Sequence, residues 1–248
     1  MANISKETFF RCDSYNQAKK QSQGYEDGVL LDSLVANIKR NSPWKDLDKN
    51  ISYIEHRQLE LLCALMRVAC ENPSKNLNVA DVGGGNGYLA MAPKTHLPMI
   101  NWNWTAFESN SVSDSYIQFQ EESGIKWKRA NDIEDIYEIG LFSCSLQYME
   151  SPFKVLERFA LKCKYLIIMR LPLLNSSNHI ITKQTFDEGI YQEANASFPA
   201  WFFSEDEFIS SLEEIGEIMY RWKTPSEVWR FEGEDVTLDG MLVRVSKS

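Results

Sequence analysis

The chain has 248 residues, of which 44% are hydrophobic, and its formal net charge at pH 7 is −9. A chain of this length and composition can bury a large core, and without a long lysine or arginine run a nucleic-acid partner is disfavoured. The N-terminus has no signal-peptide pattern, and every apolar run is shorter than the roughly 20 residues of a membrane span. We therefore expect a soluble, cytoplasmic protein with no membrane span.

Cysteine spacing indicates neither a metal site nor a disulfide framework. The chain has five cysteines at irregular intervals, with no CxxC pair among them. Cys144 and Cys163 fall within apolar runs, and we predict that both are small core residues. We accordingly expect no bound metal.

Two amphipathic helices are predicted before residue 75. Apolar residues recur at three- and four-residue intervals over 29–38, and a second, strongly apolar run covers 59–69. Residues 1–24 are polar and weakly patterned. We predict that residues 1–75 form a helical cap or lid, which could pack beside or above a ligand bound by the next segment.

A glycine-rich stretch then opens an alternation of strands and helices. Residues 78–90 combine a short apolar run, four glycines in five positions and helix-forming residues. That order is typical of a buried strand, a tight turn and a helix N-terminus. Further strands are predicted at 102–108, 125–129, 139–145 and 165–169, with helices over 109–123 and from Ser151 onward. Such alternation predicts an α/β fold with a mainly parallel sheet.

The alternation stops after the fifth strand. Residues 171–203 show no clear period, and we predict an irregular insertion on the substrate side of the sheet. A helix follows, and two strands near 217–223 and 241–245 close the chain, joined by a connection that is long for a hairpin. We assign residues 76–248 to one Rossmann-like domain, which we expect to form a compact unit with the N-terminal cap.

Two glycine patterns compete over the same turn. Gly-x-Gly-x-x-Ala at residues 85–90 fits the dinucleotide fingerprint of NAD enzymes. Asp-x-Gly-x-Gly-x-Gly at residues 81–87 fits the acidic-start pattern of S-adenosylmethionine (SAM) enzymes. Glu108 ends the second strand, where it suits the ribose of either cofactor, and Asp132 follows the third strand, where it suits an adenine amino group. The closing strand pair favours SAM, because the last strand of class I methyltransferases inserts antiparallel.

Several stretches spread over most of the chain match one family. They are residues 24–28, 81–87, 143–152, 165–172 and 198–204, among which Leu146-Gln147-Tyr148 and Pro199-Ala200-Trp201-Phe202 are the most specific. On these residues the chain resembles class I SAM-dependent methyltransferases, and more narrowly a family of bacterial methyltransferases often associated with surface-polysaccharide gene clusters. The resemblance implies a Rossmann-like sheet, mostly parallel with an antiparallel last strand, preceded by N-terminal helices. It does not supply the substrate.

The resemblance also implies roles for individual residues. Asp81 would orient the amino group of SAM, and Glu108 would accept hydrogen bonds from both ribose hydroxyls. The turn glycines would let the backbone approach the methionyl and ribose parts of the cofactor; they are Gly83, Gly84, Gly85 and Gly87.

Five more positions receive cofactor roles in the same way. Asp132 would accept a hydrogen bond from the adenine amino group, with Ile133 against the ring. Ser145 and Leu146 would lie beneath the sulfonium, and Tyr25 would close over the methionine end.

A hydroxyl acceptor would also need its proton removed, which is worth on the order of 10²–10⁴-fold in rate. His179 is the first candidate base because its ordinary pKa is near neutrality, and Tyr148 is the second. Asp187, Tyr191 and Trp201 are predicted substrate contacts, since the substrate should sit at the carboxyl ends of the strands.

We therefore predict a SAM-dependent methyltransferase that acts on a hydroxyl of a small molecule or glycan, and the resemblance suggests surface-polysaccharide biosynthesis as the context. No Asp/Asn-Pro-Pro-Tyr motif follows the fourth strand, which disfavours methylation of nucleic-acid bases. An NAD-dependent oxidoreductase and a SAM-binding protein without catalysis stay open as alternatives. Neither the acceptor nor the oligomeric state follows from the sequence.

Overall fold

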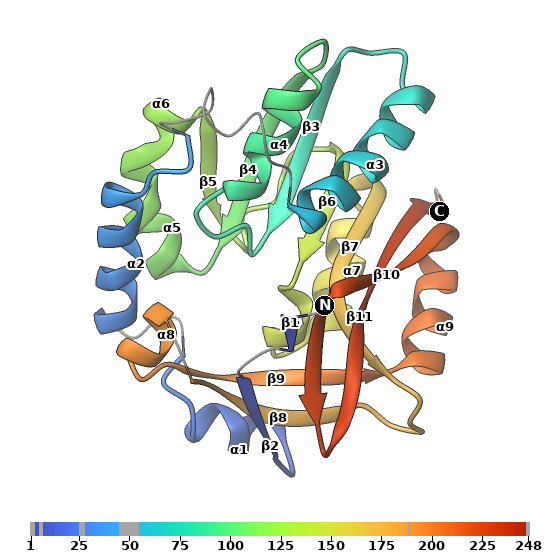
Figure 1. The fold of residues 1–248 in the computed structure, drawn as a ribbon. Helices are drawn as coiled ribbons and strands as arrows, with labels where there is room; N and C mark the ends of the chain where they lie inside the picture. The colour runs from blue at the N-terminus through green and yellow to red at the C-terminus, as the bar shows by residue number, and fades with distance from the viewer. Residues whose placement is uncertain (1–2, 5–6, 25–27, 45–54, 188, 247–248) are drawn as a thin grey trace.

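One curled sheet runs through the computed structural model, which describes residues 3–4, 7–24, 28–44, 55–187 and 189–246 (Figure 1). Its strands lie in the order β10-β11-β7-β6-β3-β4-β5, and β1 (Asn3–Ile4) pairs with the outer edge of β10. The five strands from β7 to β5 are parallel, whereas β11 runs antiparallel to both β7 and β10. Their bounds are β3 Asn76–Val82, β4 Asn101–Glu108, β5 Ile125–Arg129, β6 Tyr137–Ser143, β7 Cys163–Leu174, β10 Gly216–Phe231 and β11 Glu234–Val245.

Helices cover both faces of the sheet, because successive side chains along a strand point to opposite layers. Val79 and Ile167 pack in a core cluster with residues of α3, α4 and α5. Their neighbours Ala80 and Ile168 pack in a second cluster with residues of α7 and α9. The helices are α1 Tyr15–Lys20, α2 Gly28–Arg40, α3 His56–Glu71, α4 Tyr88–His96, α5 Asn110–Tyr116, α6 Gln120–Ser123, α7 Pro152–Ala160, α8 Gly189–Glu193 and α9 Glu205–Ile215, with 3₁₀ turns η2 Ile117–Phe119 and η3 Leu146–Tyr148.

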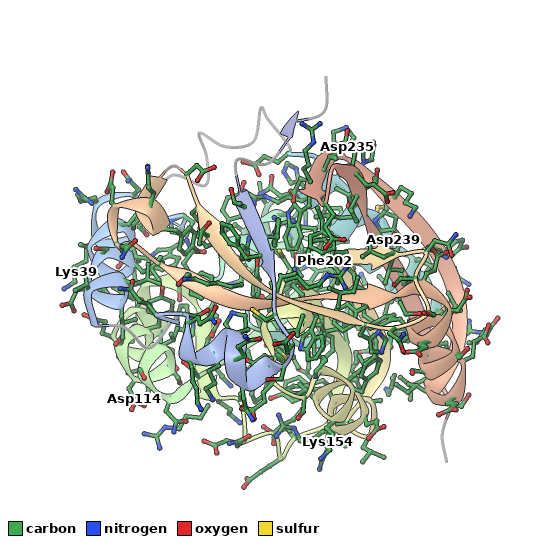
Figure 2. All side chains as sticks on the ribbon, turned by 90° about the horizontal axis from the view of Figure 1, so that it is seen from below. Lys39, Asp114, Lys154, Phe202, Asp235 and Asp239 are labelled. Carbon is green, nitrogen blue, oxygen red and sulfur yellow. The ribbon has the colours of Figure 1, made fainter. Side chains whose placement is uncertain are left out.

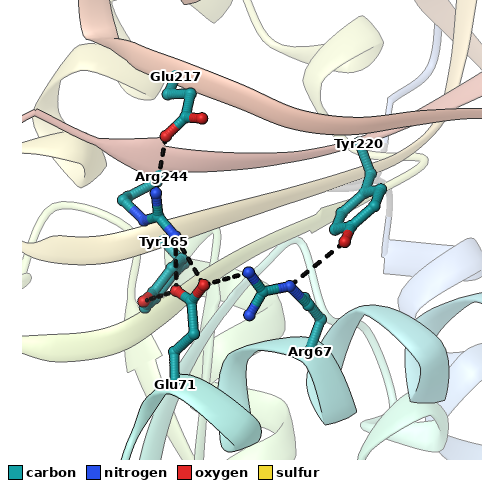
Figure 3. A network of polar contacts seen from close by, with 6 residues as sticks. All are labelled: Arg67, Glu71, Tyr165, Glu217, Tyr220 and Arg244. Atoms are coloured by element: carbon teal, nitrogen blue, oxygen red, sulfur yellow. Dashed lines mark hydrogen bonds and ion pairs between the residues drawn. The ribbon is translucent and has the colours of Figure 1, made fainter.

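A polar network joins the end of α3 to the sheet (Figure 3). The Glu71 carboxylate accepts hydrogen bonds from Arg244 Nη2 at 2.6 and 2.8 Å and from the Tyr165 hydroxyl at 2.6 Å, and it also pairs with Arg67. The hydrogen bonds from Arg244 and Tyr165 lower the pKa of Glu71 to about 2. A single carboxylate therefore connects one helix to two strands that are distant in sequence.

Several predicted elements are confirmed. The third predicted strand coincides with β5, the second differs from β4 by one residue, and the helix predicted at Ser151 begins at Pro152, which is its first helical residue. The helix predicted over 109–123 is divided into α5, η2 and α6, and it ends at Gly124 with a positive φ of 64°.

Residues 171–203 form regular structure, so the prediction of an irregular insertion was wrong. β7 continues to Leu174, and β8 (Ile180–Phe186) and β9 (Ser197–Ser204) follow it. β8 pairs antiparallel with β9 and with β2 (Glu7–Arg11), a strand of the weakly patterned N-terminus, while β9 joins β7. Nearly every residue of β9 is buried, so its sequence lacks the polar–apolar alternation of a half-exposed strand.

The last two strands form a long hairpin, and the long connection predicted between them does not exist. β10 and β11 pair from Gly216↔Val245 to Phe231↔Glu234, with register shifts between Ile218 and Tyr220 and between Thr224 and Val228. Pro225 falls within the second of these shifts, where its missing N–H costs no ladder hydrogen bond. Gly233 takes a φ of 87° in the tight turn itself. Proline and glycine here mark a bulge and a turn.

Lys39, Asp114 and Lys154 lie at the periphery when the molecule is seen from below, whereas the fully buried Phe202 lies inside (Figure 2). Among the described residues, no helix combines the length and apolar character needed to cross a bilayer.

Candidate functional site

A cavity of about 480 Å³, here called the central cavity, lies at the carboxyl ends of the parallel strands. The last residue of β4 and residues just after β3 and β6 form part of its wall. β3 has β4 and β5 on one side and β6 and β7 on the other, so strand addition reverses here. Open α/β sheets bind ligands at this kind of switch point. Residues of α2, α5, η3 and α8 complete the wall, including Leu34, Asn37, Val112, Tyr116, Tyr148 and Tyr191.

The glycine turn presents its backbone to the central cavity at Gly83 and Gly85. Gly85 has a φ of 55°, and a Cβ built there would meet no atom within 4 Å, so it would point into open space. A Cβ on Gly83 would lie 2.6 Å from Ser145 Cβ, and one on Gly87 would overlap the Ile125 side chain. Gly87 therefore serves close packing of the helix against β5, and Gly85 is the position where a ligand can approach the backbone.

Glu108 crosses from the end of β4 to the glycine turn. Its Oε1 accepts a hydrogen bond from the Gly85 N–H at 2.5 Å, and the carboxyl group lines the central cavity. Burial raises the pKa of Glu108 to about 7, although hydrogen bonds from the backbone N–H groups of Gly85 and Ser109 oppose the rise. A carboxylate held in this way is ready to accept further hydrogen bonds from a ligand's hydroxyl groups.

Asp81 lies beneath the turn and does not line the cavity. Its side chain is 1% exposed, Oδ2 accepts from the Trp104 indole N–H at 2.9 Å, and Oδ1 has no partner among the described residues. Burial raises the pKa of Asp81 to about 7, with a smaller contribution from the charge of Glu108. Gly84 covers this carboxyl group closely, since a Cβ on Gly84 would lie 2.5 Å from Oδ2.

Three more of the predicted positions belong to the wall of the central cavity. Ser145, Tyr148 and Tyr191 line the central cavity, and the buried Ser145 hydroxyl has no partner among the described residues. Leu146 is 1% exposed and packs in the core beneath this wall. The sequence thus places residues from four distant segments around one space.

His179 lies outside the lining of the central cavity. Its Nδ1 accepts from the Ser204 N–H at 2.9 Å, its Nε2 lies 3.1 Å from Glu207, and its ring stacks on Phe153. Burial lowers the pKa of His179, against the charge of Glu207. Both ring nitrogens are therefore engaged at the N-terminus of α9, which is the position of a structural cap.

Four other predicted contacts are also absent from the lining of this cavity. Asp132 is exposed, and Ile133 packs in the core cluster on the α7 side of the sheet. Asp187 is exposed near Thr8, and the Trp201 indole donates to the Met149 carbonyl at 3.0 Å. The predicted contact Tyr25 lies outside the described residues.

Two lining features were missed from the sequence. Asn37 and Leu34 come from α2, whose amphipathic pattern was recognised without any indication of which side chains would face a ligand. Cys144 was predicted to be a core residue, but it lines the cavity with a φ of 54°. Cys163 is buried, as predicted. Cys144 fell inside the strand predicted at 139–145, whereas the observed β6 ends at Ser143 and leaves Cys144 directly after it.

No protein-family model matches the chain, and no curated protein matches it either. Among solved structures, the N-terminal domain of EvdMO1 with SAH bound is 12% identical, with coverage of 68% of this chain and 75% of that one and a TM-score of 0.47. The mitomycin 7-O-methyltransferase MmcR is 15% identical over 93% of this chain and 72% of that one, with a TM-score of 0.44. The YcgJ protein from Bacillus subtilis is 11% identical over 78% and 100%, with a TM-score of 0.45.

All three TM-scores are below 0.5 and no identity among the three exceeds 15%. The function of the chain is therefore argued below from its own residues.

Proposed function

We propose that the chain binds SAM in the central cavity and transfers the methyl group to a hydroxyl of a small molecule. The observation that carries this proposal is the position of Glu108, which reaches the open glycine turn at the switch point of the sheet. An acidic side chain at the end of the second parallel strand is suited to accept hydrogen bonds from ribose hydroxyls. Bound SAM would supply a methyl group already activated by its sulfonium.

The residues at the turn fit this cofactor. Gly85 leaves open space where any side chain would protrude, and Glu108 offers a carboxylate beside it. Ser145, at the end of β6, carries a buried hydroxyl without a partner among the described residues, on the wall that adjoins Gly83. Asp81 lies one layer below, where its charge favours a positively charged ligand above the turn.

Two observations favour SAM over NAD. The turn N–H groups that would cradle a pyrophosphate are already donated, that of Gly85 to Glu108 and that of Tyr88 to Asn86 Oδ1. Glu108 is also the only charged residue among the described lining of the central cavity. No cationic side chain in this lining would offset the charge of a pyrophosphate, whereas the Glu108 carboxylate attracts the cationic sulfonium and ammonium groups of SAM.

The acceptor is proposed to lie between α2, η3 and α8. This wall is mainly apolar and aromatic, with Tyr148, Tyr191 and Leu34 and the amide of Asn37 as a polar group. Such a lining suits a ring that carries a hydroxyl, as in a phenol or a sugar. A context in surface-polysaccharide biosynthesis rests on the sequence resemblance alone.

Calorimetric titration with SAM, SAH and NAD⁺ tests the cofactor. We expect SAM and SAH to bind and NAD⁺ not to bind. Gly85→Leu should abolish SAM binding because the side chain would fill the open space at the turn. Gly233→Leu is the matched control, since Gly233 also has a positive φ with nothing within 4 Å and a similar strain of about 1–2 kcal/mol. NAD⁺ binding without SAM binding would refute the proposal.

Catalysis is tested by incubating the chain with SAM and a panel of phenols, sugars and nucleotide sugars, with SAH formation as the readout. SAH that depends on one acceptor class would identify that class. Tight SAM binding without turnover over the whole panel would instead support a SAM-binding protein without catalysis.

A further inference from the structure

A second cavity, here called the edge cavity, lies between α3 and the strands β10 and β11. Its volume is about 600 Å³, within the range of small-molecule sites, and its described lining shares no residue with that of the central cavity. One face of α3 contributes residues at three- and four-residue intervals, and the two strands form the other wall. The apolar part of the lining consists of Leu59, Cys63, Ala64, Trp222, Pro225 and Leu242. The edge cavity can therefore cover the apolar body of a ligand.

Glu60 places a half-buried carboxylate in this cavity. Its Oε2 accepts hydrogen bonds from the Thr224 hydroxyl at 2.8 Å and from the Trp222 indole N–H at 3.2 Å. Thr224 is fully buried, so this oxygen is held from within the fold. In the part of the chain that the structure describes, no donor bonds to Oε1 and no cation forms an ion pair with Glu60. The second oxygen can therefore accept hydrogen bonds from a ligand.

The surroundings of Glu60 favour a positively charged ligand. Burial raises the pKa of Glu60 and the charge of Glu227 adds to the rise, whereas the hydrogen bonds from Thr224 and Trp222 oppose it. A carboxylate that loses hydration without gaining a counter-ion is stabilised when a cation binds beside it.

Two cations on β10 belong to the lining, but their charges are neutralised from the opposite face of the sheet. Arg221 pairs with Asp239 at 2.8 Å and with Glu205 of α9 at 2.7 Å. Lys223 pairs with the same Asp239 at 2.6 Å, and the Asp239 side chain is fully buried. Neither cation is therefore available as a counter-ion for Glu60 or for an anionic ligand.

A third cation lies at the far end of the cavity. Arg67 pairs with Glu71 and donates from Nε to the Tyr220 hydroxyl at 3.4 Å (Figure 3). It follows Glu60 by seven residues, which is about 10 Å along a helix. Of the arginine, lysine and acidic side chains in the described lining, Glu60 alone has no ion pair.

The Trp222 ring forms an aromatic wall beside this carboxylate. Its N–H donates to Glu60, and its ring packs on β11, since a Cβ on Gly240 would lie 2.1 Å from Trp222 Cε2. Both contacts fix the orientation of the indole. An aromatic ring next to a carboxylate attracts an ammonium group twice, through the ring quadrupole and through a charge-assisted hydrogen bond.

We propose that the edge cavity is a binding site for a small organic ammonium ion with an apolar body. The ammonium group donates to Glu60 Oε1 beside the Trp222 ring, and the body covers the apolar wall. Leu59, which is 48% exposed, becomes buried by the ligand. This site is separate from the central cavity, so the inference does not rest on the function proposed above.

Three probes of similar size and different charge test the assignment at pH 7. They are 2-phenylethylammonium, the neutral 2-phenylethanol and the anionic 3-phenylpropanoate. Calorimetry measures each affinity, and the NMR signal of the Trp222 indole N–H, assigned by its loss in Trp222→Phe, locates the binding. We expect the ammonium probe to shift this signal and to bind about tenfold more tightly than the neutral probe, because only the cation gains the attraction of Glu60.

Matched substitutions in the two cavities separate this site from the other one. Glu60→Gln should weaken binding of the ammonium probe about tenfold and leave the affinity for 2-phenylethanol unchanged, since it removes charge and little volume. Glu108→Gln makes the same change in the central cavity and should not alter the affinity for the ammonium probe. A loss of affinity in Glu108→Gln but not in Glu60→Gln would place the ammonium ion in the central cavity and refute the assignment.

Thiol labelling of the unmodified chain tests the site even if Glu60→Gln does not fold. Cys63 and Cys70 are both exposed on α3, but only Cys63 lines the edge cavity. Saturation with 2-phenylethylammonium should slow the reaction of Cys63 with N-ethylmaleimide several-fold, as followed by peptide mass spectrometry, and leave Cys70 unchanged. Equal labelling with and without the probe would overturn the inference. Equal or tighter binding of 3-phenylpropanoate, or no binding of any probe, would overturn it as well.

Discussion

Replacing Asp81 with asparagine should raise the unfolding free energy, relative to wild type, more at pH 8 than at pH 4. Asp81 is 1% exposed beneath the glycine turn, and burial raises its pKa from an ordinary value of 3.8 to about 7. Each tenfold change in acidity corresponds to about 1.4 kcal/mol. Keeping Asp81 ionised inside the fold therefore costs about 4 kcal/mol.

The direction follows from linkage between protonation and folding. Below about pH 4 the carboxyl is largely protonated in both the folded and the unfolded chain, so it imposes no penalty. Between pH 4 and 7 the unfolded chain loses this proton while the folded chain keeps it, and stability falls as the pH rises. Above pH 7 the full penalty is present. Asparagine does not titrate and escapes this loss.

Urea unfolding of wild type and Asp81→Asn at pH 4 and pH 8 measures the effect. The difference in unfolding free energy between the two proteins should move by about 4 kcal/mol in favour of the variant from pH 4 to pH 8. Because each protein is its own reference, the changed hydrogen bond with Trp104 largely cancels. Asp114→Asn, at an exposed ion pair with Arg129, should show little change. An equal difference at both pH values would refute the reasoning.

Two further substitutions test the packing of the fold. Glu71→Gln should destabilise the chain at neutral pH. Folding lowers the pKa of Glu71 from 4.5 to about 2, so its ionised carboxylate stabilises the fold at any pH above 4.5 and this stabilisation is lost as the pH falls towards 2. Urea melts of the variant and wild type should converge near pH 2, and a constant gap would contradict this role. Phe159→Ala should cost about 3–5 kcal/mol, since Phe159 is fully buried with edge-on contacts to Phe107 and Phe142. Phe10→Ala, at a side chain that is 55% exposed, should cost far less, and similar losses would show that Phe159 is not part of a close-packed core.

The parallel part of the sheet could be predicted because local signals agree there. β5 has β-branched and aromatic residues bounded by Gly124, and α7 begins at a proline. The part of the sheet formed by β2, β8 and β9 could not be predicted in the same way. β9 is buried along nearly its whole length. β2 belongs to a segment of mixed polarity, and its paired residues in β8 run from Glu7↔Phe186 to Arg11↔Thr182, 171 to 179 positions away. Pairing over such a distance leaves no local pattern in either strand.

Like the fold, the site could be predicted only where the local sequence carries a signal. Glu108, Gly83 and Gly85 were predicted to share one site and do line one cavity, because strand ends converge at one edge of a parallel sheet. His179 was chosen for its ordinary pKa, yet its nitrogens bond to Ser204 and Glu207. Side-chain chemistry alone cannot show which groups a residue will face. Cys144 illustrates the reverse case, since its apolar sequence context concealed a position on the cavity wall.

The energetically unfavourable features of this fold are concentrated at the edge of the sheet where the cavity lies. Among the described residues, four non-glycine residues have a positive φ, and two of them, Asn195 and Glu232, occupy ordinary turns. The other two are Cys144, directly after β6, and Arg170, in the neighbouring strand β7. The two carboxyl groups whose pKa burial raises to about 7, Asp81 and Glu108, lie near the carboxyl ends of β3 and β4. A sequence selected only for stability would replace such residues, and many changes of that kind are available. Their concentration at the carboxyl edge of the sheet agrees with the binding role proposed for this edge.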